Sequence, residues 1–187
     1  MRLFLAINFT PLVRREVASA TATLRSCVPQ ASWVGEALLH LTLKFLGEQP
    51  EDQLDDIQAV VARVAGRHRE LVMAVGGIGA FPNFRRARVV WMGIAPEARL
   101  ELLHHDIEVE FEKLGIEVEG RPFRPHLTLA RIKQPLTDDE VKMLSRTARQ
   151  TDYRTDFIVR SIDLMRSDTT AAGPAYTTLV SAALRSG

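Results

Sequence analysis

One four-residue string occurs twice in this chain, and its repetition constrains the fold more than any other feature. Residues 40–43 and residues 126–129 both read His-Leu-Thr-Leu, and the two copies lie nearly half the chain apart. Each copy stands in an apolar segment that predicts a β-strand. Because a strand sends residues i and i+2 to the same face, each copy should present an imidazole beside a hydroxyl, with two leucines on the opposite face.

The spacing of the two strings predicts an internal duplication. A single histidine on a strand is more often structural than functional, but five histidines placed at random would rarely produce a second identical string. Near-equal halves around the copies suggest two lobes related by a pseudo-twofold axis, which would bring the two strands together across a cleft. Two coincidental core strands are the alternative interpretation.

The remaining sequence predicts alternating strands and helices. Strands are expected over 2–9, 38–46, 71–79, 87–94, 116–119, 125–132, 154–166 and 175–184. Helices are expected from Thr10-Pro11 to about Cys27, over 50–66 and 96–115, and from a capping box at Thr137 to about Ala148. Short turns join several neighbouring strands, which favours an α+β fold with mixed or antiparallel sheets. We expect residues 1–187 to form a single bilobal domain, with outer helices and one motif in each lobe.

Composition limits the classes of function. The 24 basic and 23 acidic residues leave a net charge of +1, whereas a protein that coats nucleic acid would be far more basic. The single cysteine, Cys27, excludes an internal disulfide framework and favours a reducing compartment. Nothing predicts a membrane span, and metal-binding strings such as His-Glu-x-x-His are absent. We therefore expect a cytoplasmic protein that needs no metal or other cofactor, has no membrane partner and acts as a monomer.

Two histidines and two threonines in one cleft suit acid–base chemistry on a phosphodiester. An imidazole pair can supply both a base and an acid near neutral pH, because the ordinary pKa is about 6.5. Hydroxyls can donate hydrogen bonds to the phosphoryl oxygens and stabilise the charge that develops there. The spacing alone does not say which histidine is the acid and which is the base.

The paired strings and their flanks resemble a known family. The pair itself resembles the 2H phosphoesterase superfamily. Segments 2–7, 40–47 and 121–131 are similar to the RNA 2',3'-cyclic phosphodiesterase (2'-5' RNA ligase-like) branch, as are the strand around Trp91 and the tail segments 164–167 and 176–179. The likeness covers essentially the whole chain.

This resemblance implies an activity and a role for each motif residue. It implies metal-independent opening of an RNA 2',3'-cyclic phosphate to a 2'-phosphate, with tRNA fragments among the candidate substrates. His126 would be the general base that activates water, and His40 the general acid that protonates the departing 3'-oxygen. Thr42 and Thr128 would bind the phosphoryl oxygens. Run in reverse with an RNA 5'-hydroxyl, the same groups would form a 2'-5' linkage.

Several further side chains have two interpretations. Arg131 could bind phosphate, but strict alternation would place it on the leucine face, so that role requires a β-bulge or a strand end before it. Alternation predicts Lys44 on the His40 face, where it would attract phosphate or lie at a solvated strand end. Phe45 and Phe123 could stack on a base, although the core is the favoured location.

The basic residues near these motifs also have two interpretations. They could contact single-stranded RNA or could belong to solvated loops. They are Arg85, Arg86, Arg88, Arg121 and Arg124. Ser167 and Tyr176 are tail positions that resemble the family.

Other functions stay open at this stage. One is a phosphodiesterase that acts on a small cyclic nucleotide or a 2'-5' oligonucleotide. Another is a module that binds RNA ends without catalysis. A metal-dependent hydrolase that uses four of the five histidines is a further possibility, although their spacing gives it little support.

Overall fold

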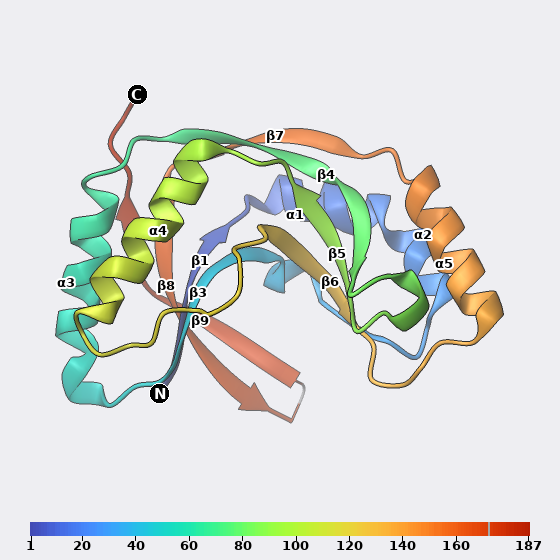
Figure 1. Cartoon of the computed structure of the whole chain (residues 1–187), viewed down its shortest axis with the longest axis horizontal. Coiled ribbons are helices and arrows are strands. Elements are labelled where there is room, and N and C mark those ends of the chain that lie inside the picture. Colours follow the sequence, from blue (N-terminus) through green and yellow to red (C-terminus); the bar gives the residue numbers. More distant parts are fainter. Residues whose placement is uncertain (172) are drawn as a thin grey trace.

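In the computed structural model, which describes residues 1–171 and 173–187, the strands form one continuous antiparallel sheet (Figure 1). The strands are β1 (Arg2–Asn8), β2 (Ser32–Trp33), β3 (His40–Glu48), β4 (Leu71–Phe81), β5 (Val89–Ile94), β6 (His126–Arg131), β7 (Arg154–Val159), β8 (Ser161–Thr170) and β9 (Gly173–Ala183). The α-helices are α1 (Pro11–Ala20), α2 (Ala22–Cys27), α3 (Leu54–Ala65), α4 (Ala98–Glu112) and α5 (Asp138–Gln150). Short 3₁₀ helices cover Glu36–Leu38 (η1), Glu51–Gln53 (η2) and Phe84–Arg86 (η3).

The strand order reveals the predicted pseudo-twofold symmetry. The sheet runs β7-β4-β5-β6-β3-β1-β8-β9, with β2 paired to β6. Strands β6 and β3 lie at the centre, so β5, β4 and β7 on one side correspond to β1, β8 and β9 on the other. The lobe that contains β3 takes β8 and β9 from the second half of the chain, and the lobe that contains β6 takes β4 and β5 from the first half. The two lobes are therefore interlocked by exchanged strands.

Helices cover each lobe from outside. Helix α3 packs against β8 and β9, and α4 packs against β3, whereas α5 packs against β4 and against α2. Figure 1 shows α3 and α4 over one end of the sheet and α1, α2 and α5 over the other. The fold is thus the bilobal α+β arrangement that the sequence predicts.

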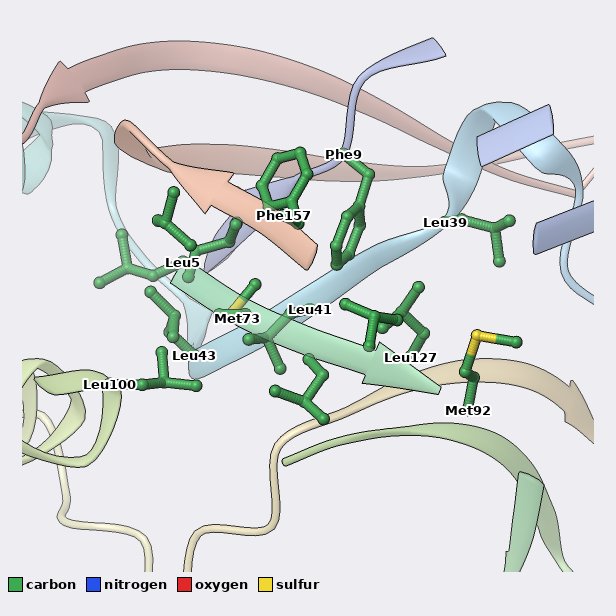
Figure 2. Close-up of a cluster of buried hydrophobic side chains, with 14 of the residues drawn as sticks. Leu5, Phe9, Leu39, Leu41, Leu43, Met73, Met92, Leu100, Leu127 and Phe157 are labelled. Carbon is green, nitrogen blue, oxygen red and sulfur yellow. The ribbon is translucent and has the colours of Figure 1, made fainter. Parts of the chain in front are cut away.

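The leucines of the two motifs lie in a shared hydrophobic core. Leu41, Leu43 and Leu127 are almost fully buried and belong to one cluster, which also holds Met73 and Met92 (Figure 2). Leu41 and Leu127 are direct partners where β3 meets β6. Burial of the leucines fixes the face of each strand, so the histidines and threonines must point to the opposite face.

Three expected elements differ from the structure. The expected helix from Pro11 to Cys27 is divided at Thr21, whose hydroxyl donates to the Val17 carbonyl at 2.8 Å. Segment 154–166 forms two strands, β7 and β8, separated at Arg160. The strand expected over 116–119 is wrong: this segment has no regular secondary structure, and side chains satisfy part of its backbone.

Candidate active site

The two motifs open into one cleft of about 700 Å³ between the lobes. Its lining includes His40 and Thr42 from β3 and His126, Thr128 and Arg131 from β6. All five candidate site residues selected from the sequence, four from the motifs and Arg131, therefore line one cleft. The antiparallel contact between β3 and β6 causes this, because it sets the two strings side by side at the centre of the sheet.

A β-bulge follows the threonine in each motif. Leu43 is the extra residue of β3, because Ala6 of β1 pairs with Thr42 and the preceding Leu5 pairs with Lys44. The same shift occurs in β6, where Val90 of β5 pairs with Ala130 and Trp91 pairs with Thr128. Each bulge buries two successive residues and returns the next one to the histidine face.

The bulge in β6 puts Arg131 in the cleft. The sequence left this position undecided, since strict alternation would have turned the side chain away. In the structure Arg131 is exposed and lines the cleft together with His126 and Thr128. The geometric condition for a phosphate-binding role is therefore met.

The bulge in β3 reverses two expectations. Lys44 does not lie on the His40 face: its side chain is 1% exposed on the core side and forms an ion pair with Glu108. Phe45 does not fill the core: it is 55% exposed and lines the cleft. Both predictions were wrong because the sequence pattern carries no clear signal for a single extra residue in a strand.

His40 is held by its backbone and by its own motif. Its Nδ1 lies 2.7 Å from the carbonyl oxygen of Leu38, and its Nε2 lies 3.1 Å from Oγ1 of Thr42. Because a carbonyl can only accept, Nδ1 carries a proton, and the lone pair of the neutral ring resides on Nε2. The ring packs against Phe4 and meets the edge of Tyr176, with centroids 5.1 and 5.4 Å away.

His126 repeats this backbone contact in different surroundings. Its Nδ1 lies 2.6 Å from the carbonyl oxygen of Arg124, again two residues upstream. Within residues 1–171 and 173–187, no group forms a hydrogen bond with its Nε2. Phe81 meets the ring at 85° with a centroid distance of 5.0 Å, and Trp91 lies 6.5 Å away. The same tautomer is therefore fixed in both histidines.

Burial is the main cause that lowers the pKa of both histidines. For His40 the hydrogen bond to Leu38 opposes this effect, while the charges of Arg14 and Arg131 add to it. For His126 the hydrogen bond to Arg124 opposes burial, and Arg131 again lowers the pKa. The lowered pKa favours the neutral form of both rings in the free protein, and in that form each Nε2 can accept a proton.

The other candidates are divided between the cleft and the rest of the surface. Arg121, Ser167 and Tyr176 line the cleft, as does Arg2. Phe123 lies elsewhere and stacks on His104, with ring centroids 3.9 Å apart. The side chains of Arg85, Arg86, Arg88 and Arg124 are not among the residues that line the cleft.

Sequence reasoning missed the support behind His40. Arg14 of α1 donates to the carbonyl of Ala37 at 2.7 Å and to Oδ1 of Asn8 at 3.0 Å. Asn8 in turn donates to the buried carboxylate of Asp163 at 2.7 Å. These residues come from distant parts of the chain and form no local motif, so no sequence signal could have joined them.

Metal-ligand clusters and membrane-spanning helices are both absent from the residues that the structure describes. In that part of the chain, no group of three or more histidine, cysteine, aspartate or glutamate side chains could hold a metal ion. No helix among the described residues is long and apolar enough to cross a membrane.

A family model, curated relatives and solved structures all match this chain over most of its length. The family model for the 2'-5' RNA ligase superfamily matches residues 13–171. A Methanothermobacter thermautotrophicus protein named RNA 2',3'-cyclic phosphodiesterase is 34% identical over 177 residues, which are 95% of each chain. A solved structure from Thermus thermophilus is 31% identical, with a TM-score of 0.83 over 100% of this chain and 99% of the other. Escherichia coli LigT, solved with 3'-AMP, shares the fold at 24% identity and a TM-score of 0.75, over 98% of this chain and 97% of its own.

Proposed function

Because this chain belongs to the 2'-5' RNA ligase superfamily, we propose that it hydrolyses the 2',3'-cyclic phosphate at RNA ends to a 2'-phosphate. The observation that carries the proposal is the meeting of two His-x-Thr pairs and Arg131 in one cleft. The name of the Methanothermobacter relative supports the choice of substrate.

In the proposed reaction, His126 is the general base. Its Nε2 has a lone pair because Nδ1 donates to Arg124, and no partner within the described residues occupies that lone pair. A lowered pKa keeps the ring neutral and able to accept a proton. His126 takes a proton from water as the water oxygen bonds to phosphorus, a transfer typically worth about 10²–10⁴-fold in rate.

His40 is the general acid of the same step. The bond between phosphorus and the 3'-oxygen breaks, and protonated Nε2 of His40 donates its proton to that oxygen. The products are a 2'-phosphate and a 3'-hydroxyl. Burial lowers the pKa of His40 in the free protein, so the bound phosphate anion must favour the protonated ring. Thr42, 3.1 Å from Nε2, holds the ring in place.

The phosphoryl group is bound by Thr42, Thr128 and Arg131. The two hydroxyls approach from opposite lobes, and the guanidinium adds a charge-assisted donor on the side of His126. No step in this scheme requires a metal ion. The reverse reaction, with an RNA 5'-hydroxyl in place of water, would form a 2'-5' linkage by the same proton transfers.

A ³¹P NMR time course would test the function. The substrate is a short RNA that ends in a 2',3'-cyclic phosphate, with excess EDTA present. We expect the 2'-phosphomonoester as the only product. A 3'-phosphomonoester would mean that the other oxygen leaves, and our assignment of roles would be wrong.

An unchanged cyclic phosphate would overturn the proposal. Repeating the assay with small cyclic nucleotides and 2'-5' oligonucleotides would then test the small-substrate alternative. Binding of the RNA without turnover would favour an end-binding module, and activity only after added Mn²⁺ or Zn²⁺ would favour a metal-dependent hydrolase.

Location, assembly and domain organisation complete the proposal. We propose a cytoplasmic monomer in which residues 1–187 act as one bilobal domain on RNA ends such as those of tRNA fragments. The single, buried Cys27 is compatible with a reducing compartment. The exchange of β4 and β8 between the lobes supports their behaviour as one unit.

A further inference from the structure

A buried ion pair outside the cleft joins β3 to helix α4. Nζ of Lys44 lies 2.6 Å from Oε2 of Glu108, and the two side chains are 1% and 8% exposed. Burying two charges is costly unless further hydrogen bonds satisfy them. In this pair, those additional bonds go to a third part of the chain.

The third part is segment 117–124, the irregular stretch that precedes β6. Lys44 donates to the carbonyl of Glu117 at 2.8 Å, and Oε2 of Glu108 accepts from the backbone N–H of Glu119 at 3.1 Å. His104 lies 3.5 Å from Oε1 of Glu108 and stacks on Phe123 with an interplanar angle of 10°. The ion pair thus forms hydrogen bonds with the backbone of this segment, which in a regular strand or helix would be made by other backbone groups.

The end of this segment contacts the active site. The carbonyl of Arg124 accepts the hydrogen bond from Nδ1 of His126, and Arg121 lines the cleft. Lys44 also lies two residues beyond Thr42 in β3 and is turned inward by the bulge at Leu43. One ion pair therefore connects the strand of one motif to the residues that orient the histidine of the other.

We propose that Lys44 and Glu108 are positioning residues for His126. By anchoring segment 117–124 they place the Arg124 carbonyl, and that carbonyl keeps the proton on Nδ1 and the lone pair on Nε2. The significance for catalysis rests on the proposed function, but the effect on the His126 ring does not. A merely structural ion pair would affect stability without changing the ring tautomer.

The test is the ¹⁵N NMR spectrum of the histidine rings in the double variant Lys44→Met/Glu108→Leu. Removing both partners avoids leaving one buried charge unpaired. We expect His126 to lose its uniform Nδ1–H tautomer and its pKa to fall, because the hydrogen bond to Arg124 raises that pKa. His40, held by Leu38, should keep its tautomer and serve as the internal reference.

Activity on the cyclic phosphate gives a second readout. We expect kcat to fall by up to about 10²-fold, the cost of a misplacement of about 1 Å, with a smaller change in KM. Glu110→Gln is the matched control, since Glu110 lies on the same helix and pairs with Arg63, Arg67 and Lys113 rather than with Lys44. The control should leave the His126 tautomer and kcat unchanged.

The outcomes separate the two proposals. An unchanged His126 tautomer and pKa in the double variant would overturn the positioning role, whatever the activity. A wild-type protein that does not hydrolyse the substrate would overturn the proposed function, while the NMR test would still stand. If the double variant does not fold, the single variant Glu108→Gln keeps the size of the side chain but removes the charge that holds Lys44 and the Glu119 N–H. It should shift the His126 tautomer and pKa in the same direction, and an unchanged ring would overturn the positioning role.

Discussion

The two motifs of the active site have the same local backbone geometry, but different side chains surround their histidines. In both, the histidine bonds to the carbonyl two residues before it, and a bulge follows the threonine. His40 has Thr42 bound to its Nε2, whereas Nε2 of His126 has no partner within residues 1–171 and 173–187. The geometry that orients the rings is thus the same in both motifs, and the groups around each Nε2 differ.

The supports behind the two rings also differ. The Leu38 carbonyl lies at the end of η1, next to Ala37, which Arg14 holds through a network ending at Asp163. The Arg124 carbonyl lies on an irregular segment held by Lys44. The network behind His40 places the positive charge of Arg14 near that ring. The ion pair of Lys44 and Glu108 is not among the charges that shift the pKa of His126. In the proposed mechanism, these differences would distinguish the acid, His40, from the base, His126.

The largest effect should come from removing either ring. We expect His40→Ala and His126→Ala each to lower kcat by about 10²–10⁴-fold, because each removes one proton transfer. Single-turnover assays across pH would check this, with circular dichroism to confirm folding. If both variants kept wild-type turnover, two-histidine catalysis would be excluded.

Removing phosphate donors should have a smaller effect. We expect Thr128→Val and Arg131→Met to lower kcat by up to about 10²–10³-fold, the usual cost of losing one donor to a developing charge. Thr42→Val should cost at least as much as Thr128→Val, because Thr42 also contacts Nε2 of His40. Steady-state kinetics of the three variants would rank them, and equal, negligible losses would argue against phosphate binding at these positions.

The charges near the rings should distinguish them by titration. Arg14 lowers the pKa of His40 alone, whereas Arg131 lowers the pKa of both histidines. We therefore expect Arg14→Met to raise only the pKa of His40, and Arg131→Met to raise both. Two-dimensional NMR titration of the ring protons is the measurement, with Arg85→Met as a control outside the cleft. A rise at His126 in Arg14→Met would contradict the asymmetry.

The smallest effect should appear in stability against pH. Since the folded pKa of each histidine lies below the ordinary value of about 6.5, the unfolded chain binds more protons as pH falls below that value. As the pH falls from about 6.5 to the lowered folded pKa values, the free energy of unfolding should therefore decrease. Thermal unfolding should show a weaker loss in His40→Gln/His126→Gln, although not a complete one, because the pKa of His104 is also lowered. Hydrogen bonds from Lys113 and Arg67 lower the pKa of Glu110 to about 2, so its carboxylate titrates in a more acidic range.

Local signals were strong enough to predict most of the fold. The Thr10-Pro11 start of α1 and the capping box at Thr137 lie where the sequence placed them. The strand predicted over 116–119 was wrong, because Lys44 and Glu108 rather than a neighbouring strand form hydrogen bonds with its backbone. Contacts between residues far apart in the chain leave no periodic signal.

The sequence by itself determined the family resemblance, the duplicated strands and the pairing of each histidine with a threonine. These follow from residue identity and the period-two alternation of a strand, both of which are local. Only the tertiary structure decided which side chains join them. One extra residue in each strand put Arg131 and Phe45 in the cleft and buried Lys44. The reason is that a bulge moves each side chain beyond it to the opposite face of the sheet.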